Sequence, residues 1–540
     1  MIWIDIEDLF VHFHAGGRPS GIQRLSLDLT AALLAEGQGR VRACRHGPGP
    51  SGFCALDWDE ARAELDAAIA GGRKPGAAKP ESDEAAEPAS QTPIPERRET
   101  VSAARRAVRR LPHQILFPLA RAWHAERRAL RSLVDIFLAQ IEALKAGGEL
   151  LGQAWRLLVP GGPAVSGAAL EARAAESHAT AEPEAQPPPP PQMQDVRLAG
   201  RPIRFEPGDV LIAAGATWQF RNYAARVARL RSAGARVAVL AHDMVPLLFP
   251  EWSVRETTER FEAWARDVLA GADMIFTNSQ ATARDVAGYA ARRGLAVATP
   301  VPLPIGASFA AARGAPAVAA SGNDGVAHPR PYVLFVSTIE PRKNHAALLR
   351  LWRRFLNTME PATVPDLVFA GKVGWLAHDV VAQAENANWF DGRLRLVEGP
   401  DDATLAALYR GCLFTVYPSL YEGWGLPVTE SLSFGKPVAA ARRGAIPEAG
   451  GQFCAYFDPD DLADMERVIG GLIRDPAAVS ALAARIEAEF RPPAWTDTAR
   501  VMLAALASAP GPRQEPEIRA ISAPAARASA RPSHAESPAR

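Results

Sequence analysis

The fold is decided by residues 416–438, which read Val416-Tyr-Pro-Ser-Leu-Tyr-Glu-Gly-Trp-Gly-Leu-Pro-Val-Thr-Glu-Ser-Leu-Ser-Phe-Gly-Lys-Pro-Val438. Residues 413–417 form a short apolar run, which is typical of a strand that is buried on both faces. Gly423 and Gly425 follow, and glycine lets a backbone pass close to a ligand. Pro427 suits the start of a helix, where its missing N–H costs nothing. The stretch therefore predicts a strand, a glycine loop and a helix.

A strand that leads through a glycine loop into a helix forms an anion site, because free N–H groups and the helix dipole point at one place. Two carboxylates, Glu422 and Glu430, frame this loop. A carboxylate beside an anion site is better suited to accept hydrogen bonds from sugar hydroxyls than to bind phosphate. The alternative is an ordinary strand–helix unit with a solvated glutamate, but the whole block is more specific than that.

The composition indicates a neutral chain that is long enough for two or three domains. It has 540 residues and a formal net charge of zero, so no overall field attracts nucleic acid or a membrane. The N-terminal residues mix acids with apolar side chains, which predicts a first strand and no signal peptide. The cysteines lack metal-like or CxxC spacing, which favours buried thiols in a reducing compartment. They are Cys44, Cys54, Cys412 and Cys454. We expect a soluble, cytoplasmic protein.

Residues 1–45 predict the start of an α/β unit. Residues 2–6 suit a strand, residues 16–24 a loop that contains Gly21 and Arg24, and residues 25–34 a helix. Glycines and cations at the start of a helix indicate a second anion site, which would face the first across a cleft. A plain turn with surface arginines explains these residues equally well.

The α/β pattern is then interrupted. Residues 71–100 and 171–194 are rich in Ala, Pro and Glu, which predicts disordered linkers. Between them, residues 103–159 have a helical pattern that combines many arginines with aromatic side chains. Such a segment is typical of an amphipathic region on an anionic membrane surface. The alternative is a helical hairpin that packs on the body, with its arginines solvated.

The α/β pattern resumes with a strand over residues 209–214, a helix over 223–233 and a strand over 236–243. His242 lies at the carboxyl end of the last strand, where open α/β sheets place ligands. A histidine there serves as often in structural hydrogen bonding as in catalysis. A later strand, residues 273–277, runs into a helix cap that begins at Asn278.

A second α/β set begins at residue 332. Its predicted strands are residues 332–337, 366–370, 394–398, 413–417 and 437–441. Its predicted helices are residues 346–355, 380–386, 403–409 and 428–434. The loop after the first strand contains Glu340, Arg342 and Lys343. A cation in this loop can meet the same phosphate as the glycine loop, because both belong to one domain.

Together these pieces resemble a known family, the retaining GT-B glycosyltransferases of the family 4, or group 1, type. The matching motifs stand in the family's order. They are Gly17-Arg-Pro-Ser-Gly-Ile-Gln-Arg24, His242-Asp-Met-Val-Pro246, Glu340-Pro-Arg-Lys-Asn344 and Glu422-x7-Glu430. The Glu-Pro-Arg-Lys-Asn motif is similar to that of a mannosyltransferase-like branch.

The resemblance implies an α/β fold with two Rossmann-like domains that face a cleft. The partly disordered helical insertion and the tail follow from the residues themselves and have no counterpart in the resemblance. Residues 1–45 and 196–310 would form the N-terminal acceptor domain, 46–195 the insertion, 311–331 a linker, 332–508 the donor-binding domain with a closing helix over 495–507, and 509–540 a disordered tail.

The resemblance also implies a role for each acid and cation. Glu430 binds the ribose of the nucleotide, Glu422 lies near the donor hexose, and Lys343, helped by Arg342, neutralises the diphosphate. The loop beside them contributes its backbone at the hexose and the diphosphate. Its donor-binding residues are Gly423, Trp424, Gly425 and Leu426.

On the N-terminal side, the resemblance places His242 beside the transferred sugar, so that it joins Glu422 and Lys343 as a catalytic candidate. Gly21 and Arg24 approach the phosphates or the acceptor. Two departures from the family pattern stand out in the C-terminal domain. Ser337-Thr338 replaces a common Gly-Arg, which indicates a shifted set of phosphate contacts, and Trp replaces a common Phe at position 424.

Transfer of a sugar breaks the bond between the anomeric carbon and the diphosphate, so charge on the leaving group must be stabilised. Lys343, Arg342 and the helix start after Gly425 can do this without a metal, and no cofactor is implied beyond the nucleotide-diphosphate sugar as co-substrate. Retention by front-face attack would leave neither glutamate as a general base, unlike the paired carboxylates of hydrolases. Asp57-Trp-Asp59 matches a short metal-binding pattern, but no apolar strand is expected before it, so we interpret it as a chance match.

The expected function is transfer of a hexose, with mannose as the candidate, to a glycan or lipid-linked glycan acceptor. Two alternatives remain open, namely a nucleotide-sugar epimerase on the same fold and a non-catalytic binding or scaffold protein. Neither nucleic acid nor a metal is expected as a partner. Peripheral contact with the inner face of a membrane through residues 103–159 is expected only if that segment is amphipathic.

Overall fold

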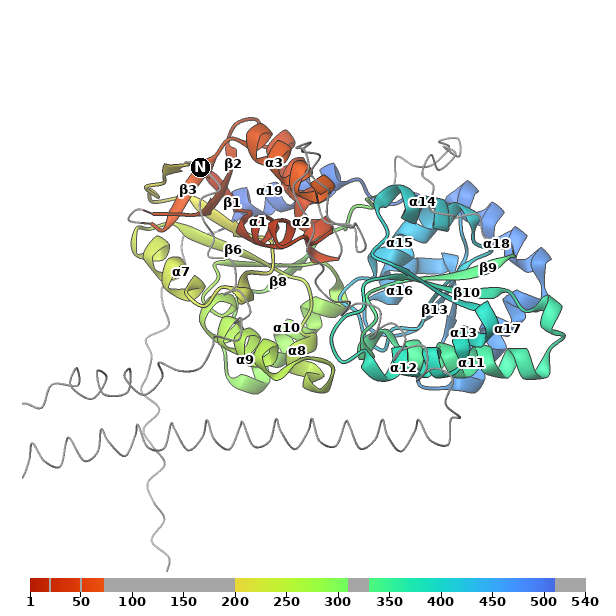
Figure 1. Cartoon of the computed structure of the whole chain (residues 1–540). Coiled ribbons are helices and arrows are strands. Elements are labelled where there is room, and N and C mark those ends of the chain that lie inside the picture. The colour runs from red at the N-terminus through yellow and green to blue at the C-terminus, as the bar shows by residue number, and fades with distance from the viewer. Residues whose placement is uncertain (19–20, 49–50, 72–199, 309–329, 510–540) are drawn as a thin grey trace, which may run out of the picture. The chain divides into compact units, whose positions relative to one another are not determined.

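The computed structural model describes residues 1–18, 21–48, 51–71, 200–308 and 330–509. All of them belong to one compact unit, in which two sheets each carry helices on their faces (Figure 1). We call the two halves the first and the second lobe. The predicted linkers, the basic helical segment 103–159 and the C-terminal tail lie outside the described residues, apart from single residues at their ends.

The described part of the first lobe contains an eight-stranded sheet with the order β4-β3-β2-β1-β5-β6-β7-β8. Its strands are β1 (Ile2–Asp5), β2 (Val41–His46), β3 (Phe53–Leu56), β4 (Arg201–Pro202), β5 (Val210–Ala213), β6 (Arg236–Ala241), β7 (Met274–Thr277) and β8 (Pro300–Pro302). Strands β2, β1, β5, β6, β7 and β8 are parallel, and β3 and β4 pair antiparallel at one end of the sheet. The order reverses between β1 and β5, which is the place where open sheets of this kind bind ligands.

Helices cover both faces of this sheet. They are α1 (Glu7–His14), α2 (Ile22–Glu36), α3 (Trp58–Gly71), α7 (Tyr223–Ser232), α8 (Val245–Leu248), α9 (Arg255–Trp264) and α10 (Gln280–Arg293). The central strands are short runs of Val, Ile, Leu and Ala, and all residues of β5 are buried. One core cluster packs on each face, as expected for strands that read as continuous apolar runs.

The second lobe, as far as it is described, contains a six-stranded sheet with the order β11-β10-β9-β12-β13-β14. Its strands are β9 (Tyr332–Val336), β10 (Asp366–Gly371), β11 (Leu394–Glu398), β12 (Thr415–Tyr417), β13 (Val438–Ala441) and β14 (Cys454–Phe457). All neighbouring strands are parallel, and the order reverses at β9. The helices are α11 (His345–Thr358), α12 (His378–Asn386), α13 (Asn388–Gly392), α14 (Asp402–Gly411), α15 (Leu426–Ser433), α16 (Ile446–Gly450), α17 (Leu462–Arg474) and α18 (Pro476–Glu489).

The last helix, α19 (Trp495–Ser508), returns to the first lobe and lies beside α2 (Figure 1). Met502 and Leu506 join the core of that lobe. Arg500 donates to both carboxylate oxygens of Glu36 on α2, at 2.9 and 3.0 Å. This helix therefore ties the C-terminal end of the described chain to the N-terminal sheet.

The two sheets bear out the expected fold class of α/β, with two Rossmann-like halves. All strands expected in the second lobe are present within a few residues of their predicted bounds. Two features of the first lobe differ from expectation. Helix α1 occupies residues for which no element was predicted, and β3 with α3 lies within the segment 46–195 that was assigned to the insertion.

These differences have physical reasons. Helix α1 begins with Glu7 and Asp8, which favour a helix N-terminus, but it is too short for a clear periodic pattern in the sequence. Strand β3 pairs antiparallel with both β2 and β4, so its identity depends on its partners rather than on its own four residues. The first lobe therefore continues to residue 71, and the boundary at residue 46 was placed too early.

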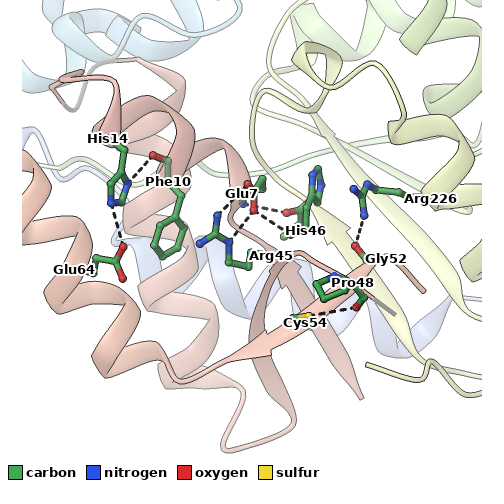
Figure 2. Close-up of polar contacts among 11 residues, drawn as sticks. Glu7, Phe10, His14, Arg45, His46, Pro48, Gly52, Cys54, Glu64 and Arg226 are labelled. Carbon is green, nitrogen blue, oxygen red and sulfur yellow. Dashed lines mark hydrogen bonds and ion pairs between the residues drawn. The ribbon is translucent and has the colours of Figure 1, made fainter. Parts of the chain in front are cut away.

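A buried ionic cluster holds β1, β2 and α1 together at the carboxyl edge of the first sheet (Figure 2). Glu7 accepts hydrogen bonds from Arg45, at 3.0 and 3.2 Å, and from the backbone N–H of His46. The guanidinium of Arg45 lies 4.5 Å from the ring centroid of Phe10. Next to this cluster, burial raises the pKa of Asp8 to about 7. These groups support the edge of the sheet, and the sequence alone did not single them out.

Candidate functional site

A cavity of about 590 Å³ lies between the carboxyl ends of the two sheets. That volume falls in the range of small-molecule sites. Every residue that the sequence analysis assigned to the site contributes to its lining. These residues are Gly21, Arg24, His242, Arg342, Lys343, Glu422, Gly423, Trp424, Gly425, Leu426 and Glu430. The structure thus brings together motifs that are separated by most of the chain.

A cluster of two buried carboxylates and two half-buried cations forms the wall of the cavity on the second lobe. Arg342 contacts Glu422 at 2.5 Å and Glu340 at 2.6 Å. Lys343 Nζ donates to Glu422 Oε1 at 2.5 Å and to the Tyr417 hydroxyl at 3.3 Å. Two cations therefore face two carboxylates, and Glu422 sits between both cations.

The local backbone explains why these side chains meet. Glu340, Arg342 and Lys343 lie at the end of β9 in a 3₁₀ turn that closes on Asn344, whose φ is 60°. The Asn344 side chain donates to the carbonyl of Pro418, which precedes the glycine loop. This amide therefore ties the loop after β9 to the loop after β12.

The pKa shifts of Glu422 and Arg342 favour their charged forms. Burial opposes the charge of Glu422, but Arg342 and Lys343 outweigh this effect and lower its pKa to about 2. Burial likewise opposes the charge of Arg342, and Glu422 with Glu340 nevertheless raises its pKa. Burial, with the charge of Arg342, lowers the pKa of Lys343. In this arrangement Glu422 orients both cations toward the cavity and is itself a poor proton acceptor.

The glycine loop allows the two lobes to touch. Residue Gly423 approaches the first lobe so closely that a Cβ atom built on it would lie 1.9 Å from the carbonyl oxygen of His242. Gly425 has φ of 114°, a conformation that favours glycine, and it immediately precedes α15. The backbone of this loop lines the cavity at the start of the helix. Pro427 stands at its second position, one residue later than predicted.

Glu430 projects from α15 into the buried side of the cavity. Its Oε2 accepts a hydrogen bond from the hydroxyl of Tyr409 at 2.8 Å. Burial raises its pKa, while the charge of Arg24 and the bond from Tyr409 act in the opposite direction. Its other oxygen is thereby left as an acceptor for a hydroxyl group in the cavity.

Arg24 reaches from α2 to the second lobe. Its guanidinium pairs with the carboxylate of Asp402 at 2.5 and 3.1 Å, at the start of α14. The sequence placed Arg24 in a loop beside the phosphates or the acceptor. The structure places it within helix α2, paired with Asp402 and close enough to Glu430 for their charges to interact. Gly21, which has φ of 50°, is the residue before that helix.

His242 follows β6 and is buried, with an exposed fraction of 4%. Its Nε2 lies 2.7 Å from the carbonyl oxygen of Ala214, so this nitrogen carries the proton and donates. Burial lowers its pKa to about 4, so the ring is neutral at physiological pH. A neutral imidazole can orient a substrate hydroxyl, but it supplies no positive charge.

Three further contacts join the two lobes near the site, and no sequence motif indicates them, because each joins elements that are distant in the chain. Both carboxylate oxygens of Glu448 accept from the backbone N–H groups of Gln280 and Ala281 at the start of α10, at 2.7 and 2.8 Å. The hydroxyl of Tyr421 donates to Asp285 at 2.8 Å. The third contact is Thr282, whose hydroxyl lies 3.3 Å from the carbonyl of Gly423.

The Asp57-Trp-Asp59 pattern has a structural explanation. Contrary to expectation, it follows a strand, β3, and it leads into α3. One carboxylate oxygen of Asp57 accepts from the backbone N–H groups of Asp59 and Glu60. Asp57 is therefore a helix cap, and the pattern is not part of the cavity lining.

Comparison with known proteins agrees with this geometry. Residues 319–487 match the family model described as glycosyl transferases group 1. The matched segment, which is most of the second lobe, is thus a group 1 glycosyltransferase domain. Together with the relatives below, it supports a glycosyltransferase as the class of the protein.

The serotype-specific mannosyltransferase WbdA of Escherichia coli is 27% identical over 284 residues, which are 50% of this chain and 34% of that protein. O-antigen chain mannosyltransferase B of Escherichia coli is 32% identical over 168 residues, 31% of this chain and 39% of that protein. The chain thus spans little more than a third of the length of these relatives.

Among solved structures, an α,α-trehalose-phosphate synthase (UDP-forming) from Burkholderia vietnamiensis is 15% identical, with a TM-score of 0.45 over 57% of this chain and 72% of that one. This similarity is too weak to support an inference about the fold. The fold assignment is therefore based on the two sheets described above.

Within the described residues, no helix is both long and apolar enough to cross a membrane.

Proposed function

We propose that this protein transfers a hexose from a nucleotide-diphosphate sugar to a glycan or lipid-linked glycan, with retention at the anomeric carbon. The single observation that carries the proposal is the convergence in one cavity of paired cations, a glycine loop at a helix start, and a buried glutamate. The printed names of the relatives favour mannose as the hexose.

The second lobe supplies what a nucleotide-diphosphate donor needs. Lys343 and Arg342 line the cavity close to the loop that precedes α15, where N–H groups favour an anion. An ammonium has three N–H donors, and only two bonds of Lys343 are accounted for by Glu422 and Tyr417. The remaining donor and the guanidinium of Arg342 stabilise the diphosphate as it leaves. Glu430 accepts from the ribose hydroxyls.

The reaction balances without an added base. The oxygen of the acceptor hydroxyl forms a bond to the anomeric carbon while the bond from that carbon to the diphosphate breaks. The hydroxyl proton passes to the leaving phosphate. His242, neutral and fixed by its bond to Ala214, orients the hexose, and the ion-paired Glu422 holds Lys343 and Arg342 in place.

We further propose that no metal takes part, because the two cations and the helix start supply positive charge where the diphosphate would lie. The test is turnover of the donor in excess EDTA. Unchanged turnover supports the metal-independent reaction, and full loss that is restored by a divalent cation overturns it.

The main experiment is a screen of purified protein against a panel of sugar nucleotides. A ligand that binds the folded state raises its melting temperature, so the true donor is expected to give the largest shift. NMR of the product formed from that donor then reports the anomeric configuration, and inversion would contradict retention. Release of free nucleotide without any acceptor would instead favour the epimerase, and the absence of any shift would favour a scaffold protein.

A further inference from the structure

A second set of residues lines the cavity without belonging to the donor site. It consists of Trp218, Trp252 and Asn278 from the first lobe and Trp375 from the second. We call these four residues the outer subsite. The proposed donor chemistry uses none of them. Trp375 nevertheless has an exposed ring, and Trp218 lies beside His242.

Trp218 is a fixed aromatic surface next to His242. Its ring centroid lies 5.1 Å from that of Phe261 and 5.7 Å from that of Trp264. Trp264 is in turn held by a hydrogen bond from its Nε1 to the hydroxyl of Thr217 at 3.0 Å. The ring of Trp218 lies 6.5 Å from the imidazole of His242, which places it beside the reacting sugar.

Asn278 offers a buried polar group at the same wall. It follows β7, lines the cavity and is only 5% exposed. Its Oδ1 has no hydrogen-bond partner among the described residues. Buried polar atoms in folded proteins nearly always have a partner, so an amide oxygen of this kind is a suitable acceptor for a ligand hydroxyl.

The mouth of the cavity carries a second aromatic surface that spans both lobes. Trp252 is stacked on Phe249, with ring centroids 4.5 Å apart. Trp375 donates from Nε1 to the backbone carbonyl of Trp252 at 2.8 Å. The side chain of Trp375 is 47% exposed, which is unusual for so large an apolar group.

We propose that the outer subsite binds a carbohydrate acceptor of at least two sugar units. The unit that receives the hexose lies against Trp218 and donates a hydroxyl to Asn278, and the following unit lies against Trp252 and Trp375. This inference rests on the proposed transfer reaction, which requires an acceptor beside His242.

The chemistry of the wall favours a sugar over a lipid. A pyranose has an apolar C–H face and a rim of hydroxyls, which matches rigid aromatic rings with polar groups between them. The polar neighbours that line the same wall are Gln219, Ser253 and Arg260. A lipid tail in this position would leave the buried Oδ1 of Asn278 without a partner, which is unfavourable.

The test measures binding of mannose, mannobiose and mannotriose to the full-length protein by calorimetry, with gluco- and galacto-trisaccharides as further probes. We expect a trisaccharide to bind about ten-fold more tightly than its monosaccharide. Trp375→Ala should remove that advantage, whereas Trp375→Phe should keep it, because a ring remains although its N–H is lost. Asn278→Ala should weaken the binding of all three mannosides. Trp58 lies outside the cavity lining, so Trp58→Ala should bind each saccharide as wild type does.

Several results would overturn the inference. One is equal binding by wild type and the alanine variants. Another is that wild type binds none of the saccharides but binds vesicles that contain a polyprenyl phosphate, which would make the acceptor a lipid. If Trp375→Phe fails as Trp375→Ala does, the tryptophan only joins the lobes through its N–H. Melting-temperature shifts with sugar nucleotides test the proposed function separately, so the two can fail independently.

Discussion

At the scale of single residues, the charge state of each group in the site depends on its surroundings and on the groups that pair with it. Glu422 is ionised because two cations face it, and His242 is neutral because it is buried and donates to a carbonyl. The sequence identified both residues by their place after strands. It did not show that Glu422 binds Lys343 and Arg342, or that Glu430 binds Tyr409, because these partners depend on how the loops fold together.

The low pKa of His242 has a consequence for stability. Its pKa is about 4 in the folded protein and about 6.5 in an unfolded chain. Its contribution to the free energy of unfolding is therefore fully present above pH 6.5 and is lost as the pH falls toward 4. At pH 5 the loss is about 2 kcal/mol. We expect the difference in unfolding free energy between wild type and His242→Gln to shrink by that amount between pH 7 and pH 5. A difference that is independent of pH would show that His242 is not buried as a neutral ring.

Glu422 also has a stabilising role that can be separated from its place in the site. Its removal leaves two half-buried cations with Glu340, which pairs with Arg342, as the remaining carboxylate of the cluster, and loss of one partner from a buried ion cluster costs about 3–5 kcal/mol. We expect Glu422→Ala to be destabilised by that amount in denaturant unfolding, and Glu422→Gln by less. Glu489→Ala, which breaks an exposed pair within one helix, is the matched control and should change stability by less than about 1 kcal/mol.

At the scale of elements, the strands of the second lobe could be predicted because each is a short apolar run with a turn on either side. Elements whose identity depends on a neighbouring strand or helix could not be predicted in this way. Strand β3 has four residues and pairs antiparallel on both sides, β14 is a four-residue edge strand, and α1 has eight residues. The contacts between the lobes were also beyond prediction, because the carboxylate of Glu448 and the start of α10 are 167 residues apart in the chain.

The loop between β12 and α15 makes the sharpest prediction at this scale. A methyl group at position 423 would collide with the carbonyl oxygen of His242. We expect Gly423→Ala to lower kcat/KM for transfer at least about ten-fold, because the lobes can no longer meet, while each lobe stays folded. Gly471→Ala in α17 is the control, since a Cβ atom there meets nothing within 4 Å. If Gly423→Ala has the activity of wild type, the contact between the loop and His242 is not needed.

At the scale of the whole molecule, the two lobes are joined by α19 and by contacts around the cavity. Glu448 is one of these contacts, and both of its oxygens accept backbone N–H groups of the other lobe. Its position at the start of α10 also places negative charge at a helix N-terminus. This carboxylate is thus one of the groups that join the two lobes beside the cavity.

We therefore expect Glu448→Gln to open the molecule. The radius of gyration from X-ray scattering should increase, and KM for the acceptor should rise several-fold, while the shift in melting temperature caused by a sugar nucleotide changes little. The reason is that the donor residues lie mainly on the second lobe. An unchanged radius together with unchanged kinetics would show that the other contacts between the lobes suffice.

The central claim, that the cavity is a site of sugar transfer from a nucleotide donor, is tested most directly by turnover of the donor that the screen identifies. Wild type is compared with Lys343→Ala and Glu430→Ala, each checked for an intact fold by its melting temperature. We predict turnover by wild type and a loss of at least about a hundred-fold in both variants. Equal turnover by all three proteins would contradict the assignment of the site.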